Sequence, residues 1–73
     1  MKYNELAKNF GFQIKMMRMK KGVTQAQLAE LLNCQENYVS CIETGKVNVT
    51  LKTINKIANS LGVKELKFFD FED

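Results

Sequence analysis

Apolar residues recur every three or four positions along most of this chain, which is the spacing of one face of an α-helix. Over about residues 4–20 the repeat consists of Leu6, Phe10, Ile14 and Met17. Further helices are predicted over about residues 24–32, 35–43, 51–61 and 64–69. Strands are not expected, because no stretch alternates apolar and polar residues for more than a few positions. The pattern therefore predicts an all-α fold, a compact five-helix bundle that forms one domain over residues 1–73.

Capping residues and glycines mark the ends of these helices, because the chain contains no proline. Thr24 is followed three positions later by Gln27, which is the spacing of a capping box. Thr50 is a second candidate N-cap. Asn33, between the second and third predicted helices, is a residue type that tolerates left-handed backbone. Gly11 interrupts the first predicted helix, where glycine is about 1 kcal/mol less favourable than alanine.

The second and third predicted helices have the spacing of a helix-turn-helix. Only about three residues separate them, which forces two short helices to cross steeply. Ala29, the fifth residue counted from Gln25, is small enough for the next helix to approach closely. Val39 and Ile42, further along, are apolar and expected to pack inward. The central part of the chain is therefore predicted to be a helix-turn-helix.

Three segments carry a resemblance to a known family: KGVTQAQLA at 21–29, VSCIETGK at 39–46 and LKTINKIANSLGV at 51–63. With them the chain resembles the phage repressor and Cro-like (XRE-type) DNA-binding domains over about residues 10–69. It departs from the family pattern at Asn33, where glycine is common, and at Val49, where proline is common. The resemblance implies a lambda-repressor-like bundle whose third helix enters the major groove of double-stranded DNA with its N-terminus first.

The same resemblance implies roles for individual side chains. Implied base-contacting residues are Glu36, Asn37, Ser40 and Cys41. Implied phosphate-contacting residues are Gln25, Gln35, Tyr38, Lys46 and Asn48, with the amides around Gly45 assisting Lys46. Asparagine can pair with adenine and a carboxylate can accept from the cytosine amino group, so the chemistry allows these roles. Plainer alternatives remain open: Gln25 and Glu36 as residues that only stabilise helix starts, and Lys46 as a solvated lysine. Tyr38 has the alternative of packing at the edge of the core.

Arg18 and Glu43 correspond to a pair that bridges the first and third helices in this family. The family usually has an aliphatic residue at the position of Cys34, so its thiol is expected to be buried. Cys41 is expected to face the DNA side, and the two cysteines are therefore expected to form neither a disulfide nor a metal site. Redox sensing through Cys41 remains an alternative. No metal or other cofactor is expected, and the chain contains no histidine.

Aromatic residues cluster at the end of the chain, at Phe68, Phe69 and Phe71. The core is expected to use Leu66 and Phe69, which would leave the others exposed, as at an interface. Because the family commonly dimerises through C-terminal helices, a homodimer on a palindromic operator is expected. The expected interface residues are Leu66, Phe68, Phe69 and Phe71, in a dimerisation segment over residues 64–73 with an acidic tail. The ending also resembles stand-alone controller proteins of restriction–modification systems; the alternative is a tail that closes its own core.

Charge favours a polyanionic partner. Residues 1–63 contain nine basic and four acidic residues, whereas the last ten contain two basic and four acidic residues, for a net charge of +3. No apolar run is long enough for a membrane span or a signal peptide, and no nucleophile–base pair is present. The sequence thus predicts a cytoplasmic, non-enzymatic, sequence-specific transcriptional regulator without a small-molecule effector. The alternative is an antitoxin or protein-interaction module built on the same scaffold.

Overall fold

The structure, a computed structural model, describes residues 1–71 as four α-helices and one short 3-10 helix. In chain order these are α1 (Tyr3–Lys20), α2 (Gln25–Leu32), α3 (Glu36–Glu43), α4 (Leu51–Leu61) and η1 (Glu65–Phe69). No strand occurs within the described range, so the all-helical prediction is confirmed there. The fifth predicted helix is present, but as a 3-10 helix.

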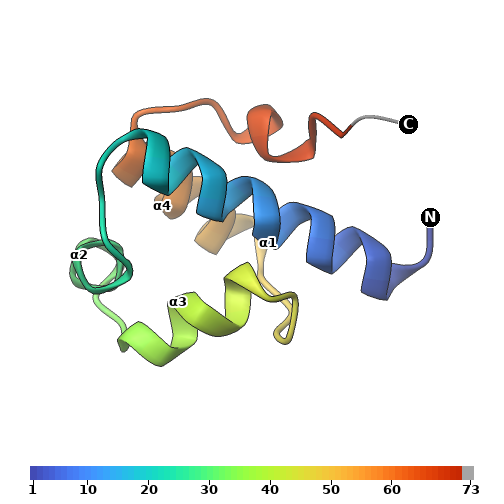
Figure 1. Cartoon of the computed structure of the whole chain (residues 1–73), viewed down its shortest axis with the longest axis horizontal. Coiled ribbons are helices and arrows are strands. Elements are labelled where there is room, and N and C mark those ends of the chain that lie inside the picture. The colour runs from blue at the N-terminus through green and yellow to red at the C-terminus, as the bar shows by residue number, and fades with distance from the viewer. Residues whose placement is uncertain (72–73) are drawn as a thin grey trace.

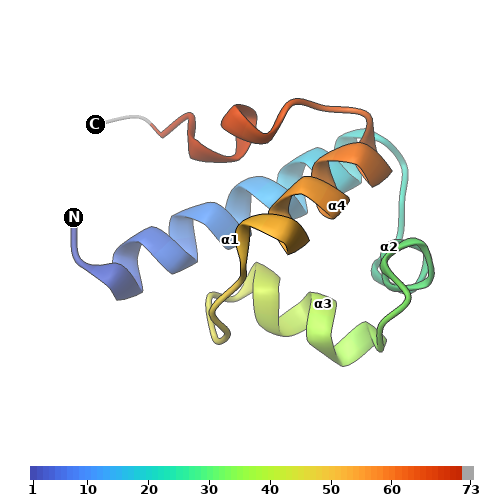
Figure 2. The ribbon, with the colours of Figure 1, turned by 180° about the vertical axis from the view of Figure 1, so that it is seen from behind.

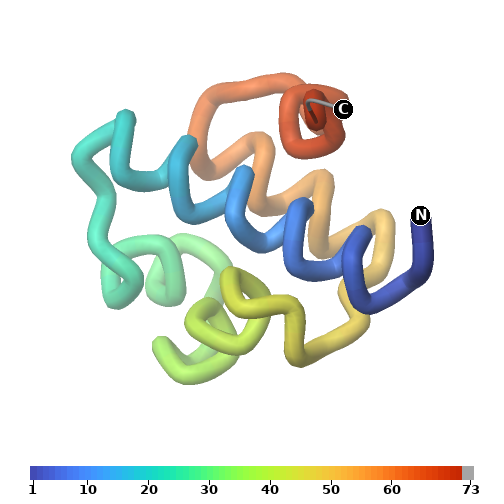
Figure 3. The backbone as a smooth tube through the Cα atoms, turned by 45° about the vertical axis from the view of Figure 1, so that its right-hand side comes forward, coloured from blue at the N-terminus to red at the C-terminus, as the bar shows by residue number. Residues whose placement is uncertain are grey.

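The long helix α1 lies in the middle of the molecule (Figure 1). Helix α3 packs against one side of α1 and η1 against another, whereas α2 packs against α3 and α4. Seen from behind, α4 lies in front of α1, with η1 above them (Figure 2). The tube view shows η1 nearly end-on, on the side of α1 opposite α3 (Figure 3). This arrangement leaves the outer side of α2 and α3 uncovered by other elements.

The helix ends follow the capping signals of the sequence. Thr24 Oγ1 accepts a hydrogen bond from the Gln27 amide at 3.0 Å, and the Gln27 side chain accepts one from the Thr24 amide at 2.9 Å. Thr50 Oγ1 caps α4 in the same manner, at 3.1 Å from the Thr53 amide. Asn33 ends α2 with a left-handed backbone, at a φ of 56°. The predicted capping box, the second N-cap and the left-handed asparagine are therefore confirmed.

The core sits where all five elements meet. Each element contributes one large, fully buried side chain, and these are Ile14, Leu28, Val39, Ile57 and Phe68. One residue of the α1 repeat is an exception, because Leu6 is 37% exposed while its neighbour Ala7 is buried. Leu6 lines an open hollow at the N-terminal half of α1 instead of the core. Leu6 therefore belongs to the apolar repeat of α1 but not to the core.

Phe68 closes the core at the C-terminal end of the described chain. It packs edge-on against Phe10, with ring centroids 5.9 Å apart, whereas Leu66 is 82% exposed. The expectation that Leu66 and Phe69 complete the core is wrong, and so is the assignment of Phe68 to an interface. In a helix with three residues per turn, Leu66 and Phe69 share one side, and η1 docks with a different side. Glu72 and Asp73, which belong to the expected acidic tail, lie outside the described residues.

Gly11 lies where α1 meets the end of α3. A Cβ atom at this position would lie 2.7 Å from the carbonyl oxygen of Glu43 and 2.8 Å from its carbonyl carbon, and closer still to the oxygen of Ile42. No side chain can occupy that space without moving backbone atoms. The glycine that looked unfavourable for the helix therefore permits the close contact between α1 and α3.

Candidate nucleic-acid interface

Helices α2 and α3 form the expected helix-turn-helix. Residues 33–35 join them, and the Cys34 amide donates to the Ala29 carbonyl at 2.9 Å across this turn. Ala29 is buried, as expected for the position where the next helix approaches. In Figure 1, α2 is seen nearly along its axis while α3 lies across the view, so the two helices cross steeply.

Helix α3 has one buried face and one free face at its leading turn. Val39 and Ile42 belong to the core, whereas Glu36 and Asn37 are exposed. Within residues 1–71, neither exposed side chain forms a hydrogen bond or an ion pair with the rest of the protein. Both are therefore available to a ligand that approaches the outer side of the helix-turn-helix.

The other α3 residues expected at DNA are less uniformly exposed. Gln35 is exposed at the N-cap, whereas Ser40 and Cys41 are half-buried one turn beyond the leading turn. Tyr38 is half-buried and packs against the hydrophobic core. That contact favours the alternative of a tyrosine at the edge of the core over a side chain devoted to phosphate.

The start of α2 offers unbonded backbone amides. The Thr24 hydroxyl accepts a hydrogen bond from the Gln27 amide, and the Thr24 carbonyl accepts one from the Leu28 amide. The amides of Gln25 and Ala26 have no partner within the described residues. Two N–H groups at a helix start form a suitable place for an anion such as a phosphate.

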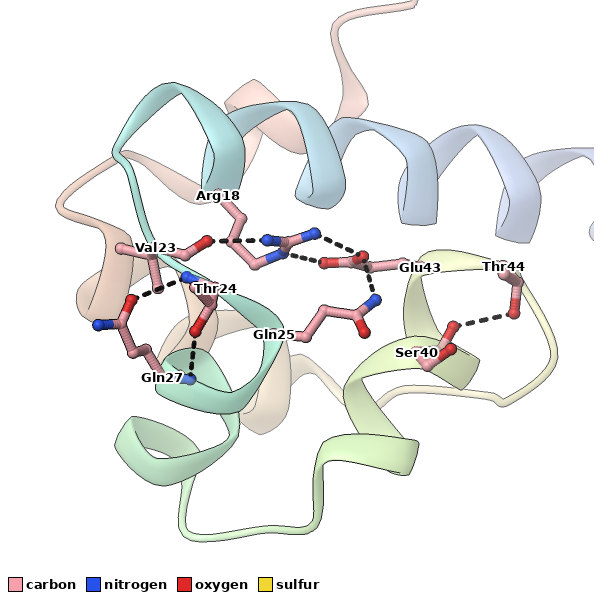
Figure 4. Close-up of polar contacts among 8 residues, drawn as sticks. All are labelled: Arg18, Val23, Thr24, Gln25, Gln27, Ser40, Glu43 and Thr44. Carbon is pink, nitrogen blue, oxygen red and sulfur yellow. Dashed lines mark hydrogen bonds and ion pairs between the residues drawn. The ribbon is translucent and has the colours of Figure 1, made fainter.

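The side chain of Gln25 is part of a polar network that links three helices (Figure 4). Arg18 Nε lies 2.6 Å from Glu43 Oε2, and Arg18 Nη2 lies 3.2 Å from Glu43 Oε1. Gln25 Nε2 donates to the same Glu43 Oε1 at 2.9 Å. Arg18 and Glu43 thus form a bidentate ion pair. They are the pair expected to bridge the first and third helices. Sequence reasoning missed that Gln25 joins it, because no local pattern connects residues 18 positions apart.

The loop after α3 presents two further side chains expected at phosphates. Lys46 and Asn48 are exposed, whereas the two loop valines pack against the core. The amides of Gly45 and Lys46 donate to carbonyls in the last turn of α3, at 3.1 and 2.9 Å. The expectation that amides around Gly45 assist Lys46 is therefore wrong for these two amides, because they already close the end of α3.

Both cysteines are free and half-buried. Burial raises the pKa of the Cys34 thiol above its ordinary value, although nearby Lys56 opposes the shift. A thiol with a raised pKa is mostly protonated at neutral pH and therefore a poor nucleophile. Within residues 1–71, no three cysteine or acidic side chains are grouped as a metal site would need.

A shallow apolar hollow of about 120 Å³ lies on another part of the surface. It opens between the first turns of α1, the loop after α3, and η1, and its lining includes Tyr3, Leu6 and Phe69. Phe69 stacks on Phe10 with ring centroids 5.1 Å apart, and Phe71 is half-buried beside it. Sequence reasoning did not single out Tyr3, which is exposed and lines this hollow.

Three relatives identify the type of protein. The chain is 35% identical over 69 residues to control protein C.BamHI of Bacillus amyloliquefaciens, and the match covers 93% of this chain and 85% of that protein. It is 33% identical over 67 residues to control protein C.MunI of a Mycoplasma species, which covers 90% of each chain. It is also 37% identical over 54 residues to the immunity repressor protein of Bacillus phage phi105, of which it spans 38%. All three are regulators and not enzymes, which supports the expectation of a non-enzymatic protein.

Solved structures agree with these relatives. The restriction–modification controller protein C.AhdI from Aeromonas hydrophila matches with a TM-score of 0.82 at 34% identity, over 89% of this chain and 97% of that one. Within residues 1–71, no helix is both long and apolar enough to cross a membrane. The helix-turn-helix family matches residues 14–68, which include α2, the turn and α3. The chain therefore belongs to the helix-turn-helix family of transcriptional regulators.

Proposed function

We propose that this protein is a cytoplasmic, homodimeric regulator that binds a palindromic DNA operator and controls a restriction–modification system. The observation that carries the proposal is the leading turn of α3, where Glu36 and Asn37 are exposed and form no hydrogen bond within the described residues. The similarity to C.BamHI and C.MunI over 85% and 90% of their lengths supports the controller assignment. The mechanism uses binding alone, without a cofactor or a small-molecule effector.

Base reading falls to the exposed side chains of α3. The Asn37 carboxamide has both a donor and an acceptor for adenine, and the Glu36 carboxylate can accept from the amino group of cytosine. Ser40 and Cys41 lie one turn further along and contact bases at the edge of the same site. Each well-formed base contact contributes roughly 1–3 kcal/mol of discrimination. Glu36 also stabilises the start of α3 through the helix dipole, and both roles are compatible.

Phosphate contacts are proposed at two places beside the recognition helix. Gln25, at the start of α2, reaches Glu43 in the last turn of α3. The loop that holds Lys46 and Asn48 follows α3 directly. Gln25 and the neighbouring amides hold one phosphate, and Lys46 with Asn48 holds a second. Gln35 contributes at the leading turn, whereas Tyr38 packs at the edge of the core. Contacts of this kind fix the register of the protein on DNA and carry no sequence information themselves.

Replacing Asn37 with alanine should remove the preference for one or two base pairs. The affinity for an operator selected from random DNA should fall by about 1–3 kcal/mol, while the affinity for unrelated DNA stays the same. Asn37 is exposed and unbonded within the described residues, so the fold should be unaffected. Selection of bound sites, followed by titration of single-base operator variants, measures both quantities.

Lys46→Ala is the matched variant, because it removes a phosphate contact and no base contact. It should weaken all DNA sequences alike and reduce the slope of log affinity against log salt concentration by about 0.9. An unchanged sequence preference in Asn37→Ala would show that α3 is not the base reader. Binding to a protein partner with almost no salt dependence, and none to DNA, would instead support the antitoxin alternative.

The dimer interface is proposed on the side where η1 and the first turns of α1 meet. Leu66 and Phe69 are exposed there beside the apolar hollow, and Phe71 is half-buried next to Phe69. Apolar surface of this kind is stabilised when a second copy covers it. A two-fold dimer places two α3 helices about 34 Å apart, which fits one turn of DNA.

Leu66→Ser should weaken the dimer without unfolding the monomer, because the Leu66 side chain is 82% exposed. If half of each leucine is covered in the dimer, the loss is about 1 kcal/mol per copy, or about thirtyfold in the dissociation constant. Sedimentation equilibrium measures this change. Leu31→Ser, at a leucine that is 58% exposed on α2, is the control and should leave the dimer intact. Equal effects of the two substitutions would place the interface elsewhere.

A further inference from the structure

The Arg18–Glu43 pair decides which way the carboxamide of Gln25 faces. An ionised carboxylate only accepts hydrogen bonds, so Gln25 must turn its nitrogen, and not its oxygen, toward Glu43. The 2.9 Å contact uses one of the two amide hydrogens of Gln25. The second hydrogen has no partner within residues 1–71. The side chain of Glu43 is only 2% exposed, so water does not compete strongly for this acceptor.

A phosphate oxygen is also an acceptor and therefore needs donors. Three unbonded donors belong to the first two residues of α2: the remaining side-chain N–H of Gln25 and the backbone amides of Gln25 and Ala26. Left free, the carboxamide would rotate and present its oxygen to the phosphate part of the time. Each side chain that must be ordered on binding lowers affinity, and a side chain held in advance avoids that loss.

We infer that Glu43 is a positioning residue for DNA, which holds Gln25 so that its free N–H joins the α2 amides as a preformed phosphate site. The inference rests on the proposed function, since it deepens the phosphate contact assigned to Gln25. Arg18 makes the arrangement compatible with DNA, because it neutralises a carboxylate that would otherwise repel a phosphate. Its Nη1 also donates to the Val23 carbonyl at 2.8 Å, just ahead of α2, so the same guanidinium ties the start of α2 to the end of α3.

A double-mutant cycle tests whether Gln25 depends on Glu43. The two backgrounds are the wild type and Arg18→Met/Glu43→Leu, in which apolar side chains of similar size replace the ion pair without leaving a buried charge. Gln25→Ala should weaken DNA binding by about tenfold in the wild type. In the Arg18→Met/Glu43→Leu background, Gln25→Ala should weaken binding by about twofold or less, because the Gln25 side chain is no longer held by Glu43.

Lys46→Ala is the matched control, since Lys46 is exposed and no contact links it to the network. It should weaken binding by the same factor in both backgrounds. Equal effects of Gln25→Ala in the two backgrounds would show that the ion pair is only structural and would overturn the inference. No effect of Gln25→Ala in the wild type would overturn it as well, while sequence-specific binding would still support the proposed function. Failure of the wild type to bind DNA would refute the proposed function itself.

If the Arg18→Met/Glu43→Leu variant does not fold, a measurement on the wild-type protein tests the same inference. Side-chain NMR relaxation reports how freely each glutamine carboxamide moves. Gln25 should be ordered in the free protein, and Gln35, which is exposed at the N-cap of α3 without a side-chain capping bond, should be mobile. Equal mobility of the two side chains would overturn the inference independently of any variant.

Discussion

Alanine in place of Gly11 should lower the free energy of unfolding by about 3 kcal/mol or more. The added methyl group would lie within 2.8 Å of the carbonyl group of Glu43, and backbone atoms cannot move aside cheaply. Helix propensity alone predicts the opposite sign, a gain of about 1 kcal/mol. A domain of 73 residues has roughly 4–11 kcal/mol of total stability, so the variant should lose between about a quarter and three quarters of it. Urea denaturation followed by circular dichroism measures the change.

Gly22→Ala is the control for this prediction. Gly22 has a φ of +71° and no atom within 4 Å of an added Cβ, so only the left-handed backbone is penalised. That penalty is about 1–2 kcal/mol. A Gly11→Ala variant more stable than Gly22→Ala would mean that α1 and α3 do not approach as closely as the structure shows.

Glu43→Leu alone should destabilise the protein by about 3–5 kcal/mol, because it leaves the guanidinium of Arg18 buried without its partner. The side chains of the pair are only 9% and 2% exposed, so water cannot replace the lost carboxylate. Adding Arg18→Met should restore most of the stability, since no charge then remains to be paired. Thermal and urea denaturation of the single and double variants measure the difference.

Salt provides the check on this second prediction. Ions screen exposed charges well and buried charges poorly, so raising the salt concentration should change the difference between Glu43→Leu and the double variant very little. A single variant as stable as the double variant would show that Arg18 finds water or another partner and that the pair is not a buried one.

Local signals in the sequence predicted most of the secondary structure. The capping box at Thr24, the N-cap at Thr50 and the left-handed Asn33 all depend on residues within a few positions of one another, and each is present. Apolar periodicity predicted the helices for the same reason, because the repeat of one helix is a local property. The exposure of Glu36 and Asn37 on α3 follows from the opposite face being apolar.

The sequence failed to predict burial correctly where two segments that are distant in the chain meet. Leu6 fits the apolar repeat of α1, yet it lines an open hollow, because no element covers the first turns of that helix fully. Leu66 and Phe69 were expected in the core, but η1 docks on α1 through Phe68. The periodicity shows which residues share a face, and it does not show which face a neighbouring element will cover.

Residue types at short spacings were enough to predict the α-helices, their caps, the helix-turn-helix and the family. The buried face of η1, the need for glycine at Gly11 and the bond between Gln25 and Glu43 became visible only in the folded arrangement of the helices. These features depend on distances between residues that the chain separates by many positions. Packing of whole elements sets such distances, and no local pattern of residues encodes them.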